Sequence, residues 1–162
     1  MSEAPDSKAP RFLISRIAVV LIALMWLVAG VMKVYDLPDF LDTIRLHDVL
    51  PFEMQFLGMV LPFLELLIAL VLVFVAGSEL RKPFGRGVLL ISLAGILGFT
   101  YYLSLVPEAI LQESGCGCVG TPLASGMQTS VRTMAAIRSG VLIVLHAVAL
   151  VGPVITMRRL KS

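Results

Sequence analysis

The sequence predicts an all-α membrane protein, a bundle of four transmembrane helices, and two observations lead to this prediction. First, 58% of the 162 residues are hydrophobic and only 15% are charged, whereas soluble domains are about 45–50% apolar and about a quarter charged. A water-soluble domain of this size leaves too much surface in water to bury so many apolar side chains. Second, the apolar residues fall into four stretches of membrane-spanning length. The composition excludes a soluble enzyme, a nucleic-acid-binding domain and a disordered chain, and the net charge of +2 indicates no polyanionic partner.

The four stretches are recognised by their lack of charge. Between Arg16 and Lys33 lie 16 uncharged residues, and both cations can reach the interfaces, which extends this stretch toward the roughly 20 residues of a bilayer span. The second stretch is interrupted only by Glu65, and the third and fourth contain no charged residue over 87–107 and 139–157. The predicted membrane domain covers residues 11–157, between a disordered tail at 1–10 and a basic tail at 158–162, with spans at about 14–34, 56–76, 87–107 and 136–157.

The first stretch also resembles a signal peptide, because basic residues precede its apolar run. It has no small-x-small cleavage site before Lys33, however, and its apolar run is longer than a typical signal core. We therefore expect an uncleaved first helix.

The distribution of Lys and Arg predicts the orientation, because basic residues are enriched on the cytoplasmic side of membrane proteins. With four helices, nine basic residues share one side and four share the other. The four are Lys33, Arg45, Arg132 and Arg138. We therefore expect both termini in the cytoplasm of a cell whose inner membrane holds the protein, and the loops after the first and third spans outside it.

The first outer segment has the pattern of a short amphipathic helix. Apolar residues recur at helical spacing from Leu37 to Ile44, Pro38 suits a first helical turn, and Pro51 favours an end. We expect a helix on the outer membrane surface, with a plain connector as the alternative and His47 exposed to solvent.

Small residues suggest how the spans pack. Ala94 and Gly98 in the third span, and Ala136 and Gly140 in the fourth, form small-x-x-x-small pairs that let helix backbones approach. They favour a compact bundle, and nothing in the sequence specifies an oligomeric state.

Two ionisable residues are expected inside the membrane. Glu65 lies roughly 13 Å below the outer end of its span at 1.5 Å per residue, where an unpaired carboxylate is costly. Arg138 can reach inward to pair with it, and Lys33 is a second candidate. A structural pair and a proton-handling role for Glu65 both stay open, while His146 is expected to be a neutral hydrogen-bonding group between helices.

The second outer loop contains both cysteines of the chain, Cys116 and Cys118, in the sequence GCGCVG. An extended three-residue unit separates its end Cα atoms by roughly 7 Å, whereas a disulfide needs about 5.5–6 Å, so the chain must bend to close one. The residues that permit such a bend are Gly115, Gly117 and Gly120. A strained, exposed disulfide in an oxidising compartment is typically labile and oxidising.

Three roles for this pair were weighed. A structural staple is poorly motivated, because closing so small a loop contributes only roughly 1.6 kcal/mol before strain is subtracted. A metal site lacks a third ligand nearby, and none is predicted. Redox activity is therefore the favoured role.

Three motifs together resemble the MauE-type methylamine utilisation proteins, within the wider DoxX-like group. They are AGVMKVYDLPDF at 29–40, VLPFLELLIALVL at 60–72 and GCGCVG at 115–120. The resemblance covers roughly residues 14–152, and Val119 stands where the family usually has an aromatic residue. It implies a four-helix inner-membrane protein that works with a thioredoxin-like periplasmic partner in maturing a disulfide-rich exported enzyme of amine metabolism. Cys116 and Cys118 correspond to the redox pair, and Lys33 and Glu65 are motif members without an assigned role.

The mechanism expected from this resemblance is thiol–disulfide exchange, in which one cysteine forms a mixed disulfide with the partner and the other resolves it. Two cysteines cannot relay electrons to a second internal pair, so the electrons pass to another protein or to a membrane quinone, although no quinone motif is recognisable. The alternative is a non-catalytic membrane scaffold or assembly subunit.

Overall fold

The computed structural model describes residues 9–51, 56–78, 82–114 and 131–158. These residues form six helices and no strand. Four helices are long and apolar enough to cross a membrane, as the sequence predicts. They are α1 (Ala9–Tyr35), α3 (Phe56–Ser78), α4 (Pro83–Leu105) and α6 (Val131–Arg158), joined by the shorter α2 (Leu37–His47) and α5 (Glu108–Ser114).

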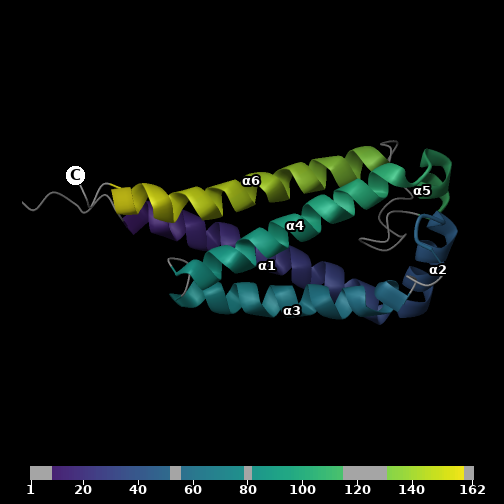
Figure 1. Ribbon diagram of the computed structural model, residues 1–162, viewed down its shortest axis with the longest axis horizontal. Coiled ribbons are helices and arrows are strands. Elements are labelled where there is room, and N and C mark those ends of the chain that lie inside the picture. The colour runs from purple at the N-terminus through teal and green to yellow at the C-terminus, as the bar shows by residue number, and fades with distance from the viewer. Residues whose placement is uncertain (1–8, 52–55, 79–81, 115–130, 159–162) are drawn as a thin grey trace, which may run out of the picture.

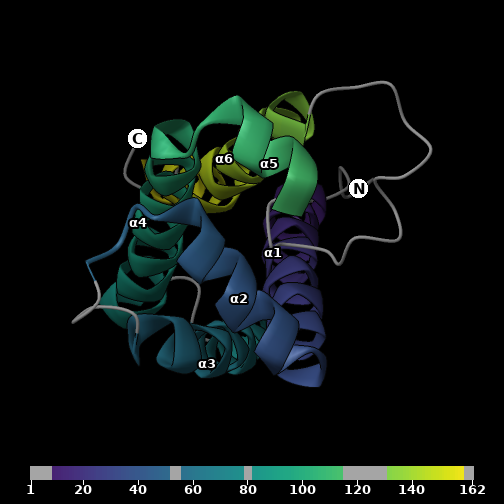
Figure 2. The same cartoon turned by 90° about the vertical axis from the view of Figure 1, so that its right-hand side faces the viewer.

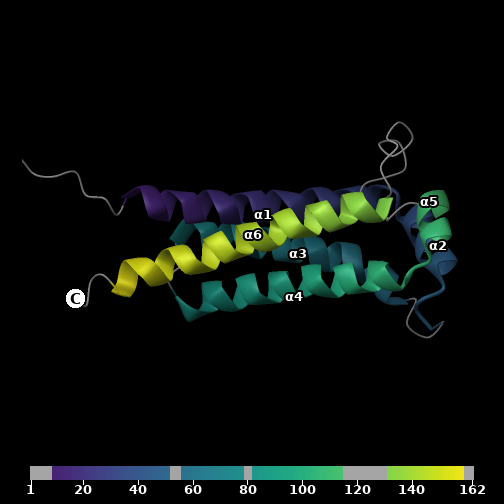
Figure 3. The same ribbon diagram turned by 90° about the horizontal axis from the view of Figure 1, so that it is seen from above.

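The four long helices form a ring with the order α3, α1, α6, α4 when viewed along the bundle (Figure 2), and α4 also contacts α3. The start of α1 and the end of α6 lie at one end of the bundle, whereas α2 and α5 lie at the other (Figures 1 and 3). We call this second end the capped end. Apolar side chains such as Leu70, Phe74 and Ile91 point outward and are exposed, which is the arrangement expected of a bundle surrounded by lipid.

Helix α2 confirms the amphipathic helix predicted for the first outer segment. Pro38 occupies its first turn, and Asp48 ends it in a left-handed conformation with φ 49°, which short polar side chains tolerate. The apolar side of α2, with Phe40 and Ile44, is buried. Ile44 contacts the position of Gly58 in α3, where an added Cβ would lie 2.7 Å from its side chain. The apolar face of α2 therefore packs on the bundle itself.

Two apolar clusters hold the helices together. The first joins buried residues of α1, α3, α4 and α6, and these are Ala18, Val19, Ile22, Ala23, Leu72, Val75, Ala76, Leu89 and Ala149. The second lies at the capped end, where Leu103, Val106 and Leu111 are buried. Helix α5 is fixed to the rest of the bundle by this second cluster.

The small-residue pairs predicted to mediate packing do not do so among the described residues. A Cβ added at Gly98 or Gly140 would meet nothing within 4 Å. The close approaches occur elsewhere: a Cβ at Gly30 would lie 2.9 Å from the side chain of Leu66, and one at Gly95 would lie 3.2 Å from the ring of Trp26. The spacing alone could not identify the contact faces, because such pairs are frequent in membrane helices.

Candidate functional site

The described part of the candidate site lies inside the capped end, where α1 and α3 are closest. Gly30 of α1 brings the two backbones together, since a Cβ there would lie 3.1 Å from the carbonyl oxygen of Pro62 in α3. One turn further along each helix, Lys33 and Glu65 face each other. The small residue in α1 thus permits a polar contact between two otherwise apolar helices.

Lys33 and Glu65 form a buried ion pair, in which the Nζ of Lys33 donates a hydrogen bond to the Oε1 of Glu65. Both residues are 4% exposed. The ammonium group also lies 5.3 Å from the ring centroid of Phe40 and 5.4 Å from that of Phe99, distances at which aromatic faces attract cations. Lys33 is therefore surrounded by one carboxylate and two aromatic rings, and Phe40 brings α2 into this site.

This geometry corrects the partner predicted for Glu65. The ion pair forms with Lys33, the second candidate, and not with Arg138. Arg138 of α6 is half-buried and adds a weaker electrostatic attraction to Glu65. Sequence spacing gives the depth of each residue in its helix but not the rotation of one helix against another, which decides the pairing.

The second carboxylate oxygen of Glu65 differs from the first. Oε2 is buried and has no hydrogen-bond partner within the described residues. A buried carboxylate oxygen without a donor is costly. It is chemically able to accept a proton or a hydrogen bond from a further group.

A second polar contact links α2 to α4. The Nδ1 of His47 lies 2.8 Å from the hydroxyl oxygen of Tyr102, and His47 is buried, so the expectation of a solvent-exposed His47 is wrong. The sequence did contain the signal: Phe40, Ile44 and His47 are spaced by four and three residues, which places them on one helix face. His47 therefore anchors the end of α2 over the bundle.

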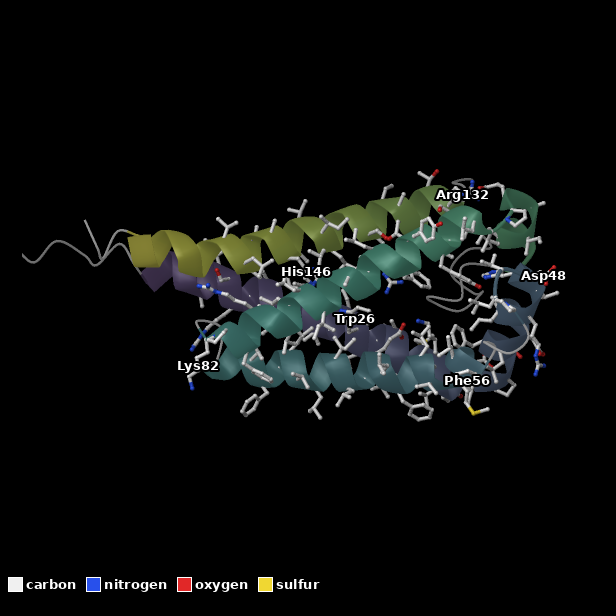
Figure 4. The ribbon with its side chains drawn as sticks, viewed as in Figure 1. Trp26, Asp48, Phe56, Lys82, Arg132 and His146 are labelled. Atoms are coloured by element: carbon white, nitrogen blue, oxygen red, sulfur yellow. The ribbon has the colours of Figure 1, made fainter. Side chains whose placement is uncertain are left out.

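His146 behaves as the sequence predicts. Its Nδ1 donates to the carbonyl oxygen of Leu142 at 2.7 Å, and its Nε2 lies 2.9 Å from the Oγ of Ser92. The Nε1 of Trp26 donates to the same Oγ at 2.8 Å. With the imidazole neutral, Ser92 donates to His146 and every polar group is satisfied. Trp26 and His146 lie near mid-length of the bundle (Figure 4), and this network joins α1, α4 and α6.

The two ends of the cysteine-containing segment lie at the capped end. Helix α5 ends at Ser114 and α6 begins at Val131, and α5 contacts both α2 and α6. Five predicted site residues lie outside the described residues, and these are Gly115, Cys116, Gly117, Cys118 and Gly120. In the part of the chain that the structure describes, no three His, Cys, Asp or Glu side chains gather as a metal site would require.

Sequence reasoning did not identify the bonds of Arg132 (labelled in Figure 4). Its Nη2 donates to the carbonyl oxygen of Val106 at 2.5 Å, and its Nε lies 3.1 Å from the Oε2 of Glu108. No sequence signal indicates this pair, because the two charged residues stand 24 positions apart on opposite sides of a connecting segment.

The model of one protein family, described as methylamine utilisation protein MauE, matches residues 11–152. The match includes all four long helices, α2, α5 and the cysteine-containing segment. Comparisons with curated proteins and with solved structures give no match.

Proposed function

The chain belongs to the MauE family of methylamine utilisation proteins, and from this premise we propose that it is an integral membrane thiol–disulfide redox protein. Its redox pair is Cys116 and Cys118, and its partner is a thioredoxin-fold protein outside the cytoplasm. The process served is disulfide formation in an exported enzyme, and in the namesake pathway that enzyme acts in amine metabolism.

One observation supports this proposal most directly. The segment that contains the chain's two cysteines connects α5 to α6, and both helix ends lie at the capped end of the bundle. The bundle thus presents its cysteines from one end, away from the ends of α1 and α6 that lead to the termini. A soluble partner on that side of the membrane meets the cysteine pair without crossing the lipid.

The proposed exchange conserves atoms and electrons. A thiolate of the reduced partner attacks one sulfur of the Cys116–Cys118 disulfide, which breaks that bond and forms a mixed disulfide. The second partner thiol then attacks the mixed disulfide, so the partner leaves oxidised and both cysteines of this chain become thiols. Two electrons have moved to the membrane protein, and a further protein or a membrane quinone must accept them to restore the disulfide.

Glu65 is proposed to serve this chemistry by handling a proton. The support is its free Oε2, which is buried at the same end of the bundle as the helix ends that flank the cysteines. The Lys33 ammonium remains on Oε1 and keeps the carboxylate in place. An intramembrane carboxylate without a full set of partners is a functional candidate by default.

The proposed orientation places the capped end outside the cytoplasm of the inner membrane. The support is the nine-to-four distribution of basic residues, since the four that fall on the sparse side belong to the capped half of the bundle.

The experiment that tests the proposed function measures the redox state of the cysteines in cells. Acid quenching and alkylation with a mass-tagged maleimide should find part of the protein protected from labelling, and prior reduction should expose both thiols. A fully reduced pair under all growth conditions would favour the alternative, a membrane scaffold whose cysteines are incidental.

A further inference from the structure

Arg132 joins the two helices that flank the cysteine-containing segment. It is the second residue of α6, and Glu108, to which its Nε is bonded, is the first residue of α5. The same guanidinium donates to the carbonyl oxygen of Val106, the residue that ends α4. One side chain therefore binds the end of α4, the start of α5 and the start of α6.

The contacts around Arg132 make this junction specific. Val106 is buried, and it packs with Leu103 and Leu111 in the apolar cluster of the capped end. A carbonyl oxygen at a helix end lacks a partner within its own helix, and Arg132 supplies one. A charge-assisted hydrogen bond and an ion pair from one planar group fix direction as well as distance.

We propose that Arg132 is a positioning residue for the thiol exchange, because it holds together the two ends of the segment that presents Cys116 and Cys118 to a protein partner. This inference rests on the proposed function. Positioning matters for a folded partner, which must bring its own active-site sulfur in line with a cysteine of this chain. It matters little for a small thiol, which can approach from many directions.

The test uses the full-length protein in nanodiscs with its cysteines oxidised, and two reductants of different size. Purified reduced thioredoxin and dithiothreitol are mixed separately with the protein, and the rate of thiol appearance is measured. Arg132→Gln should lower the rate constant with thioredoxin by about two- to fivefold, as fits a half-exposed ion pair with one added hydrogen bond. The rate with dithiothreitol should be unchanged.

Two further variants complete the experiment. Arg132→Lys keeps the charge but not the planar fork, and it should recover part of the thioredoxin rate. Arg45→Gln is the matched control, because Arg45 pairs with Asp42 on the exposed side of α2 at the same end of the bundle. It should leave both rates unchanged.

The outcomes separate this inference from the proposed function. Equal loss of both rates in Arg132→Gln, or no loss of either, would overturn the positioning role while the redox function stands. A wild-type protein that reacts with neither reductant would overturn the proposed function, and the inference with it.

Discussion

Lys33 of α1 is paired with Glu65 of α3 inside the bundle, and both side chains are almost completely buried. Phe40 and Phe99 cover the ammonium group on two further sides. Two helices that are otherwise apolar are thereby fixed in register at the end of the bundle that carries α2. Removing one partner leaves the other charge buried in an apolar surrounding, which is far more costly than removing both.

The first prediction concerns this pair. Glu65→Leu leaves Lys33 unpaired between two aromatic rings, and the protein should lose about 3–5 kcal/mol of stability. Its amount in the membrane and its unfolding temperature in detergent should both fall. Glu65→Gln can still accept a hydrogen bond from Lys33 and should remain folded.

The double variant Lys33→Met with Glu65→Leu provides the control for that prediction. It removes both charges and should regain much of the lost stability. If Glu65→Leu alone changes neither amount nor unfolding temperature, the pair does not hold α1 to α3. If Glu65→Gln is normally abundant but loses thiol exchange, the acid serves the chemistry.

The second prediction concerns the network of Trp26, Ser92 and His146. Ser92→Ala leaves the indole N–H and the Nε2 of His146 without partners, which should cost about 1–2 kcal/mol. Because Trp26 is the single tryptophan of the chain, its fluorescence emission should also shift. Ser104→Ala is the matched control, since Ser104 is exposed and donates only to the carbonyl oxygen of Tyr101. Identical spectra and melting curves for both variants would contradict the network.

The third prediction compares glycines. Gly30→Ala places a Cβ 2.9 Å from Leu66 and 3.1 Å from the carbonyl oxygen of Pro62, so it should destabilise the protein by about 1–3 kcal/mol. Gly98→Ala and Gly140→Ala enter open space and should be neutral or stabilising by up to about 1 kcal/mol. Thermal unfolding in detergent distinguishes them, and equal effects at all three positions would show that α1 and α3 do not approach closely at Gly30.

The fourth prediction concerns orientation. A fluorescent reporter fused after Ser162 should be active, as expected for a cytoplasmic carboxyl terminus, and an alkaline phosphatase inserted near Ser125 should be active outside the cytoplasm. The opposite pattern would place the cysteines in a reducing compartment and remove the basis for a stable disulfide there.

The sequence predicts the spans well because charge is so costly in lipid that its absence marks them. The boundaries are less certain: α4 begins at Pro83 and α6 at Val131, several residues before the predicted starts, because Arg86, Arg132 and Arg138 lie within the helices near their ends. Side-chain pairing was harder to predict, since it depends on helix rotation. Glu65 was recognised as a buried acid needing a cation, but only the structure selects Lys33 over Arg138.

Other parts of the site follow from tertiary contacts that no local pattern encodes. Phe99 lies over Lys33 because α4 closes the ring of helices, and Arg132 reaches Glu108 because α5 folds back over the bundle end. The burial of His47, in contrast, could have been predicted from its place on the apolar face of α2.

The central claim is that Cys116 and Cys118 exchange disulfides with a thioredoxin-fold protein, and trapping of the mixed disulfide tests it most directly. Cys116→Ser and Cys118→Ser each remove the thiol that would resolve or initiate the exchange. Cells expressing each variant are quenched in acid, and the protein is purified under non-reducing conditions and analysed by mass spectrometry. The account predicts that at least one variant carries a reducible adduct whose second component has a thioredoxin fold, and that the double variant carries none. If both single variants lack an adduct and support the same cellular disulfide formation as the wild type, the redox account is contradicted.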